Sequence, residues 1–387
     1  MKIALVTETF PPEINGVAMT LGQLASGLVE RGHRVTVFRP RQSISDSPAL
    51  AAGYAELLVR GFPIPGYALL KLGLPSPRTL QREWRRERPD LVHIATEGPL
   101  GYSALVVARK LQIPITSSFH TNFHSYSKHY GFPFAGPSAL AYLRHFHNRT
   151  LATFSPTLEL NAQLEENGFK NMRLLGRGVD TDTFSPARRN DSIRKQLGLT
   201  PKDLLVVHVS RLAAEKNYSL LIESFRAIKR IRPTARLVVT SDGPLRKRLA
   251  RENLDVVFTG FLSRLELAEH YASADLFLYP SLTETFGNVV TEALASGLPV
   301  VAFNYAAAAR YIRHQENGWL VPLADSRDFV ESAVLLASND ALRAKIIPRA
   351  RATAEGIPWS AVIDGFARDL SDLVGAQAQV PTVSATV

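Results

Sequence analysis

Two glutamates, Glu284 and Glu292, lie on either side of a short segment that follows an apolar run. Their separation predicts that Glu284 precedes a helix and that Glu292 lies about one turn inside it. Between them, the backbone of Phe286, Gly287 and Asn288 would offer N–H groups at the helix start, where an anion is favoured. One carboxylate could then accept hydrogen bonds from sugar hydroxyls and the other from a ribose. Two solvated glutamates are the ordinary alternative, but both lie among apolar residues, where an unpaired carboxylate is costly.

A pair of cations follows the apolar run 204–209. Arg211 and Lys216 are five positions apart in a loop between an expected strand and an expected helix. Arginine presents a planar fork and lysine a point charge, so together they could hold the two phosphoryl groups of a diphosphate. The plainer alternative is a pair of solvated surface cations.

Two residues in the first half of the chain occupy positions where α/β folds bind ligands. Gly16, in PPEINGV, lies between the first expected strand and helix, where a glycine lets N–H groups approach a phosphate. His120 directly follows the expected strand 113–119, and ligands bind at the carboxyl ends of such strands. Each of them alone is more often a structural residue. The turn at Gly16 lacks the G-x-G-x-x-G fingerprint, so no nicotinamide or flavin is expected.

Metal and thiol chemistry are disfavoured. The chain has no Cys, which removes thiolate nucleophiles, disulfide scaffolds and Cys-ligated zinc. Histidines gather after His120, but their spacing is irregular and no acidic residue lies among them. They are His124, His129, His145 and His147. We therefore expect neither a metal nor a cofactor.

The charge favours anionic partners, because 45 basic residues exceed 35 acidic ones and give a net charge of +10. Residues 60–88 hold seven Lys or Arg and two Glu, which is half of the excess. The same stretch contains the apolar residues Phe62, Ile64, Tyr67, Leu69, Leu70, Leu72 and Leu74. This composition suits a segment that lies on an anionic membrane. It equally suits a buried apolar loop followed by a solvated basic helix, and both interpretations remain open.

Two further partner classes can be weighed from composition. A basic nucleic-acid-binding protein would also explain the charge, but aromatic residues do not alternate with the cations and no recognition motif is present, so no nucleic acid is expected. No apolar run approaches the roughly 18 residues of a membrane span. The start MKIALVTETF is typical of a strand rather than a signal peptide. We expect a cytoplasmic protein, peripheral on the inner face of the membrane.

Strand and helix patterns alternate along both halves of the chain, which predicts two parallel α/β sheets. The first half has expected strands at 2–6, 35–38, 91–94 and 113–119, and helical patterns at 21–28 and 102–111. The second half has expected strands at 204–209, 237–240, 256–259, 276–279 and 299–302, and helices at 220–231, 265–273 and 289–296. Ser263 and Glu266 have the spacing of a capping box.

The alternation breaks in the turn-rich segment 171–190, and we place the domain boundary near Pro186. This predicts a first domain at 1–186 and a second at 187–358, followed by a helix at 359–374 and a loose tail at 375–387. Because ligands bind outside the carboxyl ends of parallel strands, the active site is expected in a cleft between the two domains.

Eight separated segments together resemble glycosyltransferase family 4, whose members have the GT-B fold of two Rossmann-like domains facing each other across a cleft. They appear in family order over nearly the whole chain: PPEINGV, LVERGHRVTV, FHTNF, GRGVDTDTF, SRLAAEKN, SDGPL, the Glu-x7-Glu segment and SGLPVVA. The resemblance implies retaining transfer of a hexose from a nucleotide diphosphate sugar without a metal ion. It also implies that the last helix, around 361–373, returns to the first domain.

Roles for the individual residues follow from the resemblance. The loop of Gly16 should approach the diphosphate, His120 should contact the donor sugar, and Arg211 with Lys216 should neutralise the leaving diphosphate. Glu284 should bind the sugar and Glu292 the ribose. The backbone of three residues should hold sugar and phosphate, and that of three others should contact the nucleobase. The first three are Phe286, Gly287 and Asn288, and the others are Gly260, Phe261 and Leu262.

Two departures narrow the resemblance to a subgroup. Many relatives have paired glycines where this chain has Asn15-Gly16, and Asn where it has Arg177. Both variants resemble the subgroup of GDP-mannose-dependent α-mannosyltransferases and of sulfoquinovosyl, glucosyl and glucuronosyl glycolipid enzymes. The leading hypothesis is mannosyl transfer from GDP-mannose to a lipid-linked or glycan acceptor. The alternative is transfer from a UDP-sugar to diacylglycerol, and a nucleotide-sugar epimerase of the same fold is a weaker one. No carboxylate is an obvious nucleophile, which favours front-face attack.

Overall fold

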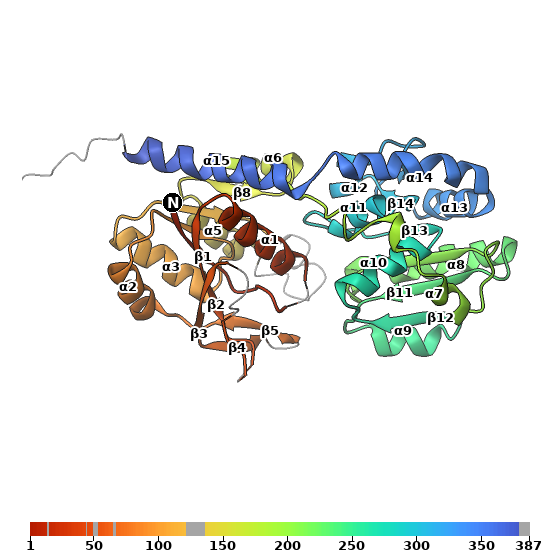
Figure 1. Ribbon diagram of the computed structural model, residues 1–387, viewed down its shortest axis with the longest axis horizontal. Coiled ribbons are helices and arrows are strands. Elements are labelled where there is room, and N and C mark those ends of the chain that lie inside the picture. The colour runs from red at the N-terminus through yellow and green to blue at the C-terminus, as the bar shows by residue number, and fades with distance from the viewer. Residues whose placement is uncertain (14, 44, 49–52, 65–66, 121–135, 379–387) are drawn as a thin grey trace, which may run out of the picture. The chain divides into compact units, whose positions relative to one another are not determined.

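The computed structural model describes residues 1–13, 15–43, 45–48, 53–64, 67–120 and 136–378. The chain forms two compact units, one of residues Met1–Arg177 continued from Ser360, and one of residues Gly178–Trp359 (Figure 1). Within each unit, strands and helices alternate along the chain, as the sequence predicts.

The first unit is built on a parallel sheet of seven strands in the order β3-β2-β1-β6-β7-β8-β9. The strands are β1 (Lys2–Val6), β2 (Arg34–Pro40), β3 (Ala55–Val59), β6 (Leu91–Ile94), β7 (Ile115–Ser118), β8 (Thr153–Ser155) and β9 (Met172–Leu174). The described helices of residues 1–177 are α1 (Gly16–Glu30), α2 (Pro77–Arg86), α3 (Pro99–Lys110), α5 (Gly136–His147) and α6 (Leu158–Glu166). All four residues of β6 and of β7 are buried, as expected for central strands of a parallel sheet. The buried hydroxyls of Thr116 and Ser118 on β7 bond to the ring of His93 on β6.

The segment 60–88 forms a hairpin followed by a helix. Strands β4 (Gly61–Ile64) and β5 (Tyr67–Gly73) pair antiparallel, which the sequence interpretation missed. The helix α2 is the solvated basic helix of one of the two interpretations, with Leu80 and Trp84 buried and its arginines exposed. Residues 65–66 lie outside the described part of the chain. The apolar residues before α2 therefore belong to a sheet hairpin and not to an irregular loop.

The last helix, α15 (Trp359–Ala378), packs on the first unit. The ring of Phe366 meets the rings of His93 and Phe154 edge-on, with centroids 5.1 and 5.0 Å apart. Ion pairs join Asp364 to Arg31 and Asp369 to Arg173. The helix extends through Ala378. Residues 375–378, which the sequence analysis placed in a loose tail, are therefore its last turn. Residues 379–387 lie outside the described residues.

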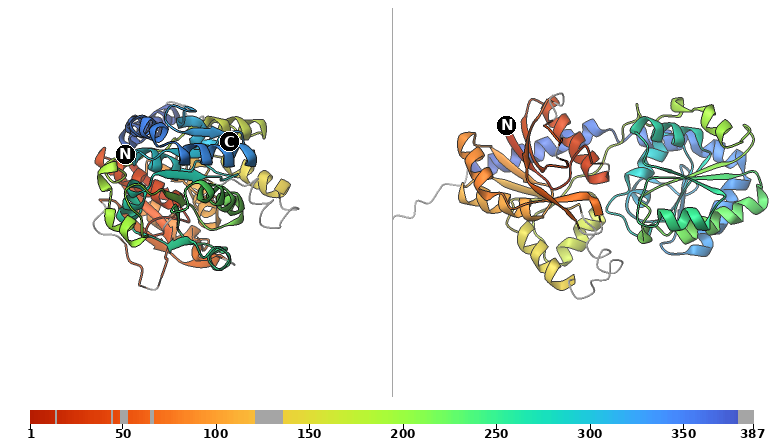
Figure 2. Two further views of the ribbon diagram at one scale, coloured as in Figure 1. Left: turned by 90° about the vertical axis from the view of Figure 1, so that its right-hand side faces the viewer. Right: turned by 90° about the horizontal axis from the view of Figure 1, so that it is seen from below.

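The second unit is built on a parallel sheet of six strands in the order β12-β11-β10-β13-β14-β15. The strands are β10 (Leu205–Val209), β11 (Arg236–Thr240), β12 (Val256–Gly260), β13 (Leu276–Tyr279), β14 (Val300–Phe303) and β15 (Trp319–Val321). The helices are α7 (Asp191–Gln196), α8 (Tyr218–Ile231), α9 (Arg246–Glu252), α10 (Arg264–Ser273), α11 (Asn288–Ala295), α12 (Ala306–Tyr311), α13 (Ser326–Ser338) and α14 (Asp340–Glu355), with short 3₁₀ turns η1 (Pro186–Arg188) and η2 (Ala214–Lys216). Figure 2 shows helices on both faces of this sheet. The capping box of Ser263 and Glu266 is confirmed at the start of α10.

The two units divide earlier in the chain than Pro186. Residues just after Arg177 already belong to the second unit, because the N–H of Val179 donates to the carbonyl of Ile357 (3.0 Å) and Phe184 is buried in the second core. Sequence patterns alone placed the boundary in the middle of the turn-rich segment, since they do not show which core an irregular segment joins.

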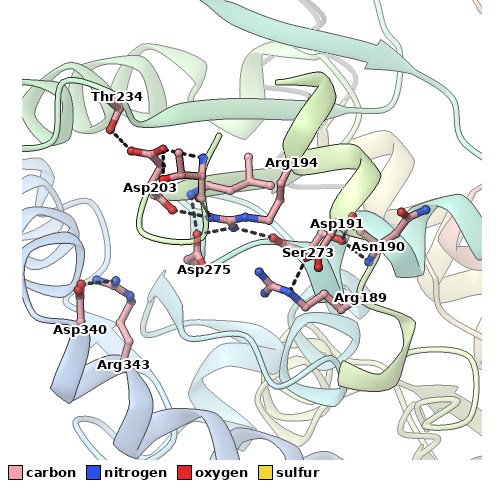
Figure 3. Close-up of polar contacts among 12 residues, drawn as sticks. Arg189, Asn190, Asp191, Arg194, Asp203, Thr234, Ser273, Asp275, Asp340 and Arg343 are labelled. Atoms are coloured by element: carbon pink, nitrogen blue, oxygen red, sulfur yellow. Dashed lines mark hydrogen bonds and ion pairs between the residues drawn. The ribbon is translucent and has the colours of Figure 1, made fainter. Parts of the chain in front are cut away.

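A buried polar cluster fastens the edge of the second sheet where its strands begin (Figure 3). The guanidinium of Arg194 donates to Asp275 (2.8 Å) and to the carbonyls of Ser273 (3.0 Å) and Thr200 (3.2 Å). Asp275 also accepts from the N–H of Leu205 (2.7 Å). These contacts tie α7 to the starts of β10 and β13, at the amino ends of the strands.

The described residues contain no helix that is both long and apolar enough to cross a membrane.

Candidate functional site

Lys216 and Glu284 form an ion pair at the carboxyl edge of the second sheet. Lys216 ends the turn η2 after β10, and Glu284 lies in the loop after β13. These strands are neighbours and run parallel, so their loops leave the sheet at the same edge. The ammonium Nζ bonds to Oε1 of Glu284 and lies 3.3 Å from the carbonyl of Thr283. The sequence selected both residues but not their contact.

Glu284 accepts two further hydrogen bonds at the same oxygen. The hydroxyls of Tyr279 and Ser281 donate to Oε1, the latter over 2.8 Å. Tyr279 is buried, and burial raises its pKa well above the usual value, so it stays a neutral donor. Glu284, Phe286, Tyr279 and Ser281 line one small pocket with Tyr305. The sequence analysis missed Tyr279, Ser281 and Tyr305, because an aromatic or serine next to a strand carries no signal of its own.

Arg211 is held by a carboxylate within its own loop. Its Nη2 lies 2.7 Å from Oε1 of Glu215, four residues further on. The predicted pair of cations therefore lies at this edge with each cation on a carboxylate, Arg211 on Glu215 and Lys216 on Glu284. A diphosphate approaching this loop would meet partly compensated cations. The sequence did not show this pairing.

A buried hydrogen-bond chain supports the same loop from behind. Nδ1 of His208 donates to the carbonyl of Leu278 (2.7 Å), so Nε2 accepts from the hydroxyl of Ser210 (2.7 Å). The hydroxyl of Tyr218 lies 2.9 Å from that of Ser210. Burial lowers the pKa of His208 to about 4, which keeps the ring neutral. The residue before Arg211 is thereby fixed to the neighbouring strand and to α8.

The helix α11 starts as the sequence predicts. Asn288 is its first residue, Gly287 is the N-cap, and Glu292 lies about one turn inside. Gly287 has φ of +92°, which side chains of L-residues rarely allow. Because the N-cap residue is a glycine, it has no side chain that could accept from the first N–H groups of α11. An anion beside Glu284 could take that place.

Glu292 is a half-buried carboxylate with one tyrosine partner. The hydroxyl of Tyr271 lies 3.3 Å from its Oε2. Burial raises the pKa of Glu292 to about 7, against the opposing charge of Arg264 and the hydrogen bond from Tyr271. This carboxyl therefore carries a titrating proton near neutral pH, where it could accept from, or donate to, a sugar hydroxyl.

The residues predicted to contact the nucleobase lie at the end of β12. Gly260 ends this strand with φ of +79°, and a Cβ there would meet the guanidinium of Arg246 at 2.9 Å. Phe261 is 45% exposed, and Leu262 is half-buried. The strand ends at the same edge of the sheet as the loops of Lys216 and Glu284, so the three predicted groups share one edge of the second unit.

In the first unit, the loop of Gly16 is closed by its own side chains. Oδ1 of Asn15 accepts from the N–H groups of Val17 (3.1 Å) and Ala18 (2.9 Å) at the start of α1. The carboxylate of Glu13 in turn accepts from Asn15 Nδ2 (3.1 Å) and from Thr9. Two of the N–H groups expected to face a phosphate thus already have an acceptor. A phosphate contact from this loop stays a prediction, and the N–H group of Gly16 is the donor that it now concerns.

His120 lies beyond the end of β7 and contacts Arg177. The guanidinium Nη2 lies 2.9 Å from the imidazole Nδ1. Of the other histidines, His147 is buried and bonds to the hydroxyl of Ser117 (2.9 Å), whereas His124 and His129 lie outside the described residues. The part of the chain that the structure describes contains no cluster of metal-binding side chains.

A buried carboxylate that the sequence analysis missed lies two residues beyond β1. Glu8 accepts from the N–H of Leu100 (2.8 Å) at the start of α3 and from the N–H of Gly73 at the end of β5. Burial raises the pKa of Glu8 to about 7. A Cβ at Gly98 would come within 2.4 Å of this carboxylate. Glu8 thus fastens the hairpin to α3 and serves the fold.

The predicted site residues are divided between the units. Gly16 and His120 lie in the first unit, and the remaining ten lie in the second. These ten residues lie at the end of β12 or in or just after the loops that follow β10, β12 and β13, at one edge of the second sheet.

Two family models cover most of the chain. "Glycosyltransferase Family 4" matches residues 14–183, and "Glycosyl transferases group 1" matches residues 189–353. The chain is 32% identical over 366 residues to a GDP-mannose-dependent alpha-mannosyltransferase of Mycobacterium tuberculosis, covering 94% of each protein. It is 31% identical over 371 residues to a sulfoquinovosyl transferase of Arabidopsis thaliana, covering 93% of this chain and 71% of that one.

Solved structures show the same fold. A sucrose-phosphate synthase of Thermosynechococcus elongatus matches with a TM-score of 0.80 at 18% identity, over 97% of this chain and 99% of that chain. WaaG, a glycosyltransferase involved in lipopolysaccharide biosynthesis, matches with a TM-score of 0.72 at 18% identity, over 95% and 99%. The two Rossmann-like units are those of the GT-B fold. The chain belongs to the family 4 glycosyltransferases, and it is an enzyme of that class.

Proposed function

We propose that this enzyme transfers a mannosyl group from GDP-mannose to a lipid-linked or glycan acceptor, with retention of the anomeric configuration. The relatives in Mycobacterium tuberculosis and Corynebacterium glutamicum named GDP-mannose-dependent alpha-mannosyltransferase support the donor. The observation that carries the proposal is the Lys216–Glu284 pair beside the start of α11, which joins a cation, a carboxylate and backbone donors at one sheet edge.

The chemistry requires charge stabilisation on the departing diphosphate. Lys216 and Arg211 supply positive charge at the carboxyl edge of the sheet, and the N–H groups at the start of α11 supply aligned dipoles. The diphosphate therefore competes with Glu284 for Lys216 as its charge develops. We expect this arrangement to work without a metal ion. Equal turnover in EDTA and in Mg²⁺ tests this expectation, and strict dependence on Mg²⁺ would contradict it.

Glu284 is a sugar-binding group in this proposal, and not a nucleophile. Its Oε1 accepts from Lys216, Tyr279 and Ser281, and three donors lower the nucleophilicity of that oxygen. Front-face attack fits this arrangement, because the departing phosphate oxygen takes the proton of the acceptor hydroxyl while the new glycosidic bond forms. Mass spectrometry of the enzyme after rapid quenching tests it, and a glycosylated Glu284 or His120 would overturn it.

The donor is tested by calorimetric titration with GDP and with UDP in parallel, without metal. Binding of GDP at least tenfold tighter than UDP is expected, equivalent to about 1.4 kcal/mol. The alternative donor has its own support, because an alpha-monoglucosyldiacylglycerol synthase of Streptococcus pneumoniae is 27% identical over 321 residues. A preference for UDP would favour transfer from a UDP-sugar to diacylglycerol, with the same site residues. Nuclear magnetic resonance of the product then gives the anomeric configuration.

We further propose that the enzyme acts at the cytoplasmic face of the membrane through the segment 60–88, as a peripheral protein. Arg78 and Arg85 are exposed on α2, and Phe62 on the hairpin that precedes α2 is 36% exposed. A segment that exposes both basic and apolar side chains suits an anionic lipid surface.

Sedimentation with vesicles tests the membrane proposal. Binding to vesicles that contain anionic phospholipid, and not to vesicles of phosphatidylcholine alone, is expected for the intact chain. Arg78→Gln with Arg85→Gln should release the protein. The matched control removes two exposed cations from α9 in the second unit, with Lys247→Gln and Arg251→Gln. Equal release by both double variants would show that net charge alone governs binding.

A further inference from the structure

Arg177 and His120 form a buried pair between the ends of two strands of the first sheet. His120 lies two residues after β7, and Arg177 lies three residues after β9. Only 7% of His120 and 4% of Arg177 are exposed. The pair joins the motif FHT to the motif GRGVD, which are far apart in the sequence. Neither motif by itself indicates this contact.

The guanidinium of Arg177 is oriented by its own turn. Its Nη1 donates to the carbonyls of Leu175 (2.7 Å) and Gly176 (3.0 Å). Two hydrogen bonds from one nitrogen leave the planar group little freedom to rotate. The other terminal nitrogen, Nη2, is thereby directed at Nδ1 of His120, 2.9 Å away.

This contact determines which ring nitrogen of His120 carries the proton. A guanidinium has five N–H donors and no acceptor, so Nδ1 must accept the hydrogen bond through its lone pair. A neutral imidazole that accepts at Nδ1 carries its proton at Nε2. The contact therefore excludes both the Nδ1–H tautomer and the imidazolium for as long as it is made.

The surroundings also keep the ring neutral. Burial comes first among the causes that hold the pKa of His120 well below its usual value, followed by the positive charge of Arg177. His93 on β6 and His147 at the end of α5 act in the same direction. Among the residues that the structure describes, these three are the titratable groups whose charge bears on the ring.

The backbone that carries His120 is fixed from the other side. The N–H of Phe119 donates to the carbonyl of Phe154 on β8 (2.7 Å). The ring of Phe119 packs against those of His147 and Phe169, with centroids 5.4 and 5.9 Å apart. The imidazole is thus held at its backbone by neighbouring strands and at its ring by Arg177.

We propose that Arg177 is a positioning residue that fixes His120 as the Nε2–H tautomer, so that His120 meets the donor sugar only as a hydrogen-bond donor. The part that concerns the sugar rests on the proposed function, whereas the tautomer does not. A fixed Nε2–H can stabilise a hydroxyl oxygen of the hexose. It leaves no lone pair at Nε2, so His120 is neither the base nor the nucleophile of the reaction.

The tautomer is tested without substrate by ¹⁵N resonance of the imidazoles in full-length protein labelled at histidine. The expected spectrum of the native protein shows His120 unprotonated at Nδ1, protonated at Nε2 and unchanged between about pH 5 and 8. In Arg177→Met, the Nδ1–H tautomer of His120 should become populated, because the donor that holds the Nδ1 lone pair is removed. A proton at Nδ1 in the native protein, or the same tautomer in both proteins, would overturn the proposal.

Turnover with the donor sugar tests the positioning role. Arg177→Met should lower kcat about tenfold, since a buried acceptor loses its partner, and should leave the affinity for GDP unchanged. Arg177→Lys keeps the cation and should recover part of the loss, and it carries both tests if Arg177→Met does not fold. The matched control is Arg173→Met, which removes the arginine within β9 that pairs with Asp369.

The outcomes separate this proposal from the proposed function. A fixed Nε2–H tautomer with unchanged turnover in Arg177→Met would overturn the positioning role. An equal loss in Arg173→Met would show that the effect is general destabilisation. Absence of transfer from GDP-mannose and from UDP-sugars by the native protein would overturn the proposed function, while the resonance result would still decide the tautomer.

Discussion

The helices α1 and α11 each begin after a loop that follows a strand of a parallel sheet, yet the N-termini of the two helices differ. At α1 the side chain of Asn15 accepts from the N–H groups of Val17 and Ala18. At α11 the cap is Gly287 in the left-handed region, which has no side chain to accept from the first N–H groups. A helix start presents donors that must find a partner. At α1 the cap residue is that partner, whereas the glycine cap of α11 suits the anion that the proposed function places there.

Individual buried carboxylates of the two units show a similar contrast. Glu8 and Glu13 of the first unit accept from backbone N–H groups and neutral side chains, and they fasten a hairpin and a loop. Glu284 of the second unit bonds to Lys216, which a diphosphate could claim. The contrast teaches that the first two carboxylates are held by groups of the fold, whereas Glu284 is held by a cation that the proposed function assigns to the diphosphate.

The largest expected effect is at Lys216, whose replacement tests the role of the second unit in the reaction. Lys216→Ala should lower kcat for hexosyl transfer by about 10²–10³-fold, because it removes charge that stabilises the leaving diphosphate. Steady-state kinetics with GDP-mannose measures it. Lys247→Ala, on the exposed face of α9, is the control for loss of one positive charge. Retained activity in Lys216→Ala would mean that the ion pair only stabilises the loop.

Gly287 offers a test of the open helix start. Gly287→Ala places a side chain at φ of +92°, which should cost about 1–2 kcal/mol of unfolding free energy. It should also weaken GDP binding, since the first N–H groups of α11 shift. Urea unfolding and calorimetry measure the two effects. Gly365→Ala on α15, where a Cβ meets nothing within 4 Å, should do neither. GDP affinity that survives the strain would remove this helix start from the site.

Glu292 sharpens the comparison through pH. Its pKa of about 7 means that the ionised fraction grows as the pH rises through neutrality. A ribose hydroxyl that donates to the carboxylate favours the ionised form, so GDP affinity should rise between about pH 6 and 8 by up to tenfold. Glu292→Gln should bind more weakly at high pH and show no such rise. A flat profile in the native protein would remove Glu292 from the ribose role.

The contribution of Glu292 to the unfolding free energy should change with pH in the opposite direction to the affinity for GDP. The folded protein holds the proton of Glu292 up to about pH 7, whereas the ordinary pKa of a glutamate is about 4.5, so this group binds more protons in the folded state between these values. The contribution of Glu292 to the unfolding free energy should therefore fall as the pH rises through that window, and the difference between the native protein and Glu292→Gln measures it. Glu8, whose pKa is also raised to about 7, contributes with the same sign. The buried histidines His147 and His208, whose pKa values are lowered, contribute with the opposite sign.

The smallest effect is expected at Asn15, which caps the N-terminus of α1. Asn15→Ala removes the cap of α1 and should cost about 1 kcal/mol of unfolding free energy. The affinity for GDP should change by no more than roughly twofold, because Asn15 already occupies the N–H groups of Val17 and Ala18 and leaves only Gly16 for a phosphate. Thermal unfolding and calorimetry on the same samples measure both. A tenfold loss of affinity would mean that Asn15 itself supports the donor site.

Much of the fold follows from local patterns. The predicted strands 2–6, 91–94 and 276–279 agree with β1, β6 and β13 to the residue. Buried parallel strands are continuous apolar runs bounded by polar turns, so their ends are marked in the sequence. The hairpin β4–β5 was missed because its residues carry charge and apolar side chains in no clear alternation. The helix α15 runs further than predicted, since small residues such as Gly375 and Ala376 give no stop signal.

The candidate site was selected by the sequence and assembled by the structure. The start of α11 between Glu284 and Glu292 followed from spacing, because helix geometry is local. The bond from Lys216 to Glu284 and the donors Tyr279 and Ser281 could not be read, since they depend on which strands are neighbours. The closed start of α1 depends on one side-chain rotamer of Asn15.

The sequence by itself thus determined the class of fold, the family and the residue types of the donor chemistry, because apolar periodicity and motif spacing are properties of the chain. Tertiary structure alone decided the partners. Lys216 meets Glu284 because β10 and β13 pair, and Arg177 meets His120 because β7 and β9 flank β8 in one sheet. Such contacts join residues far apart in the chain, and only the packing of the strands brings them within hydrogen-bond distance.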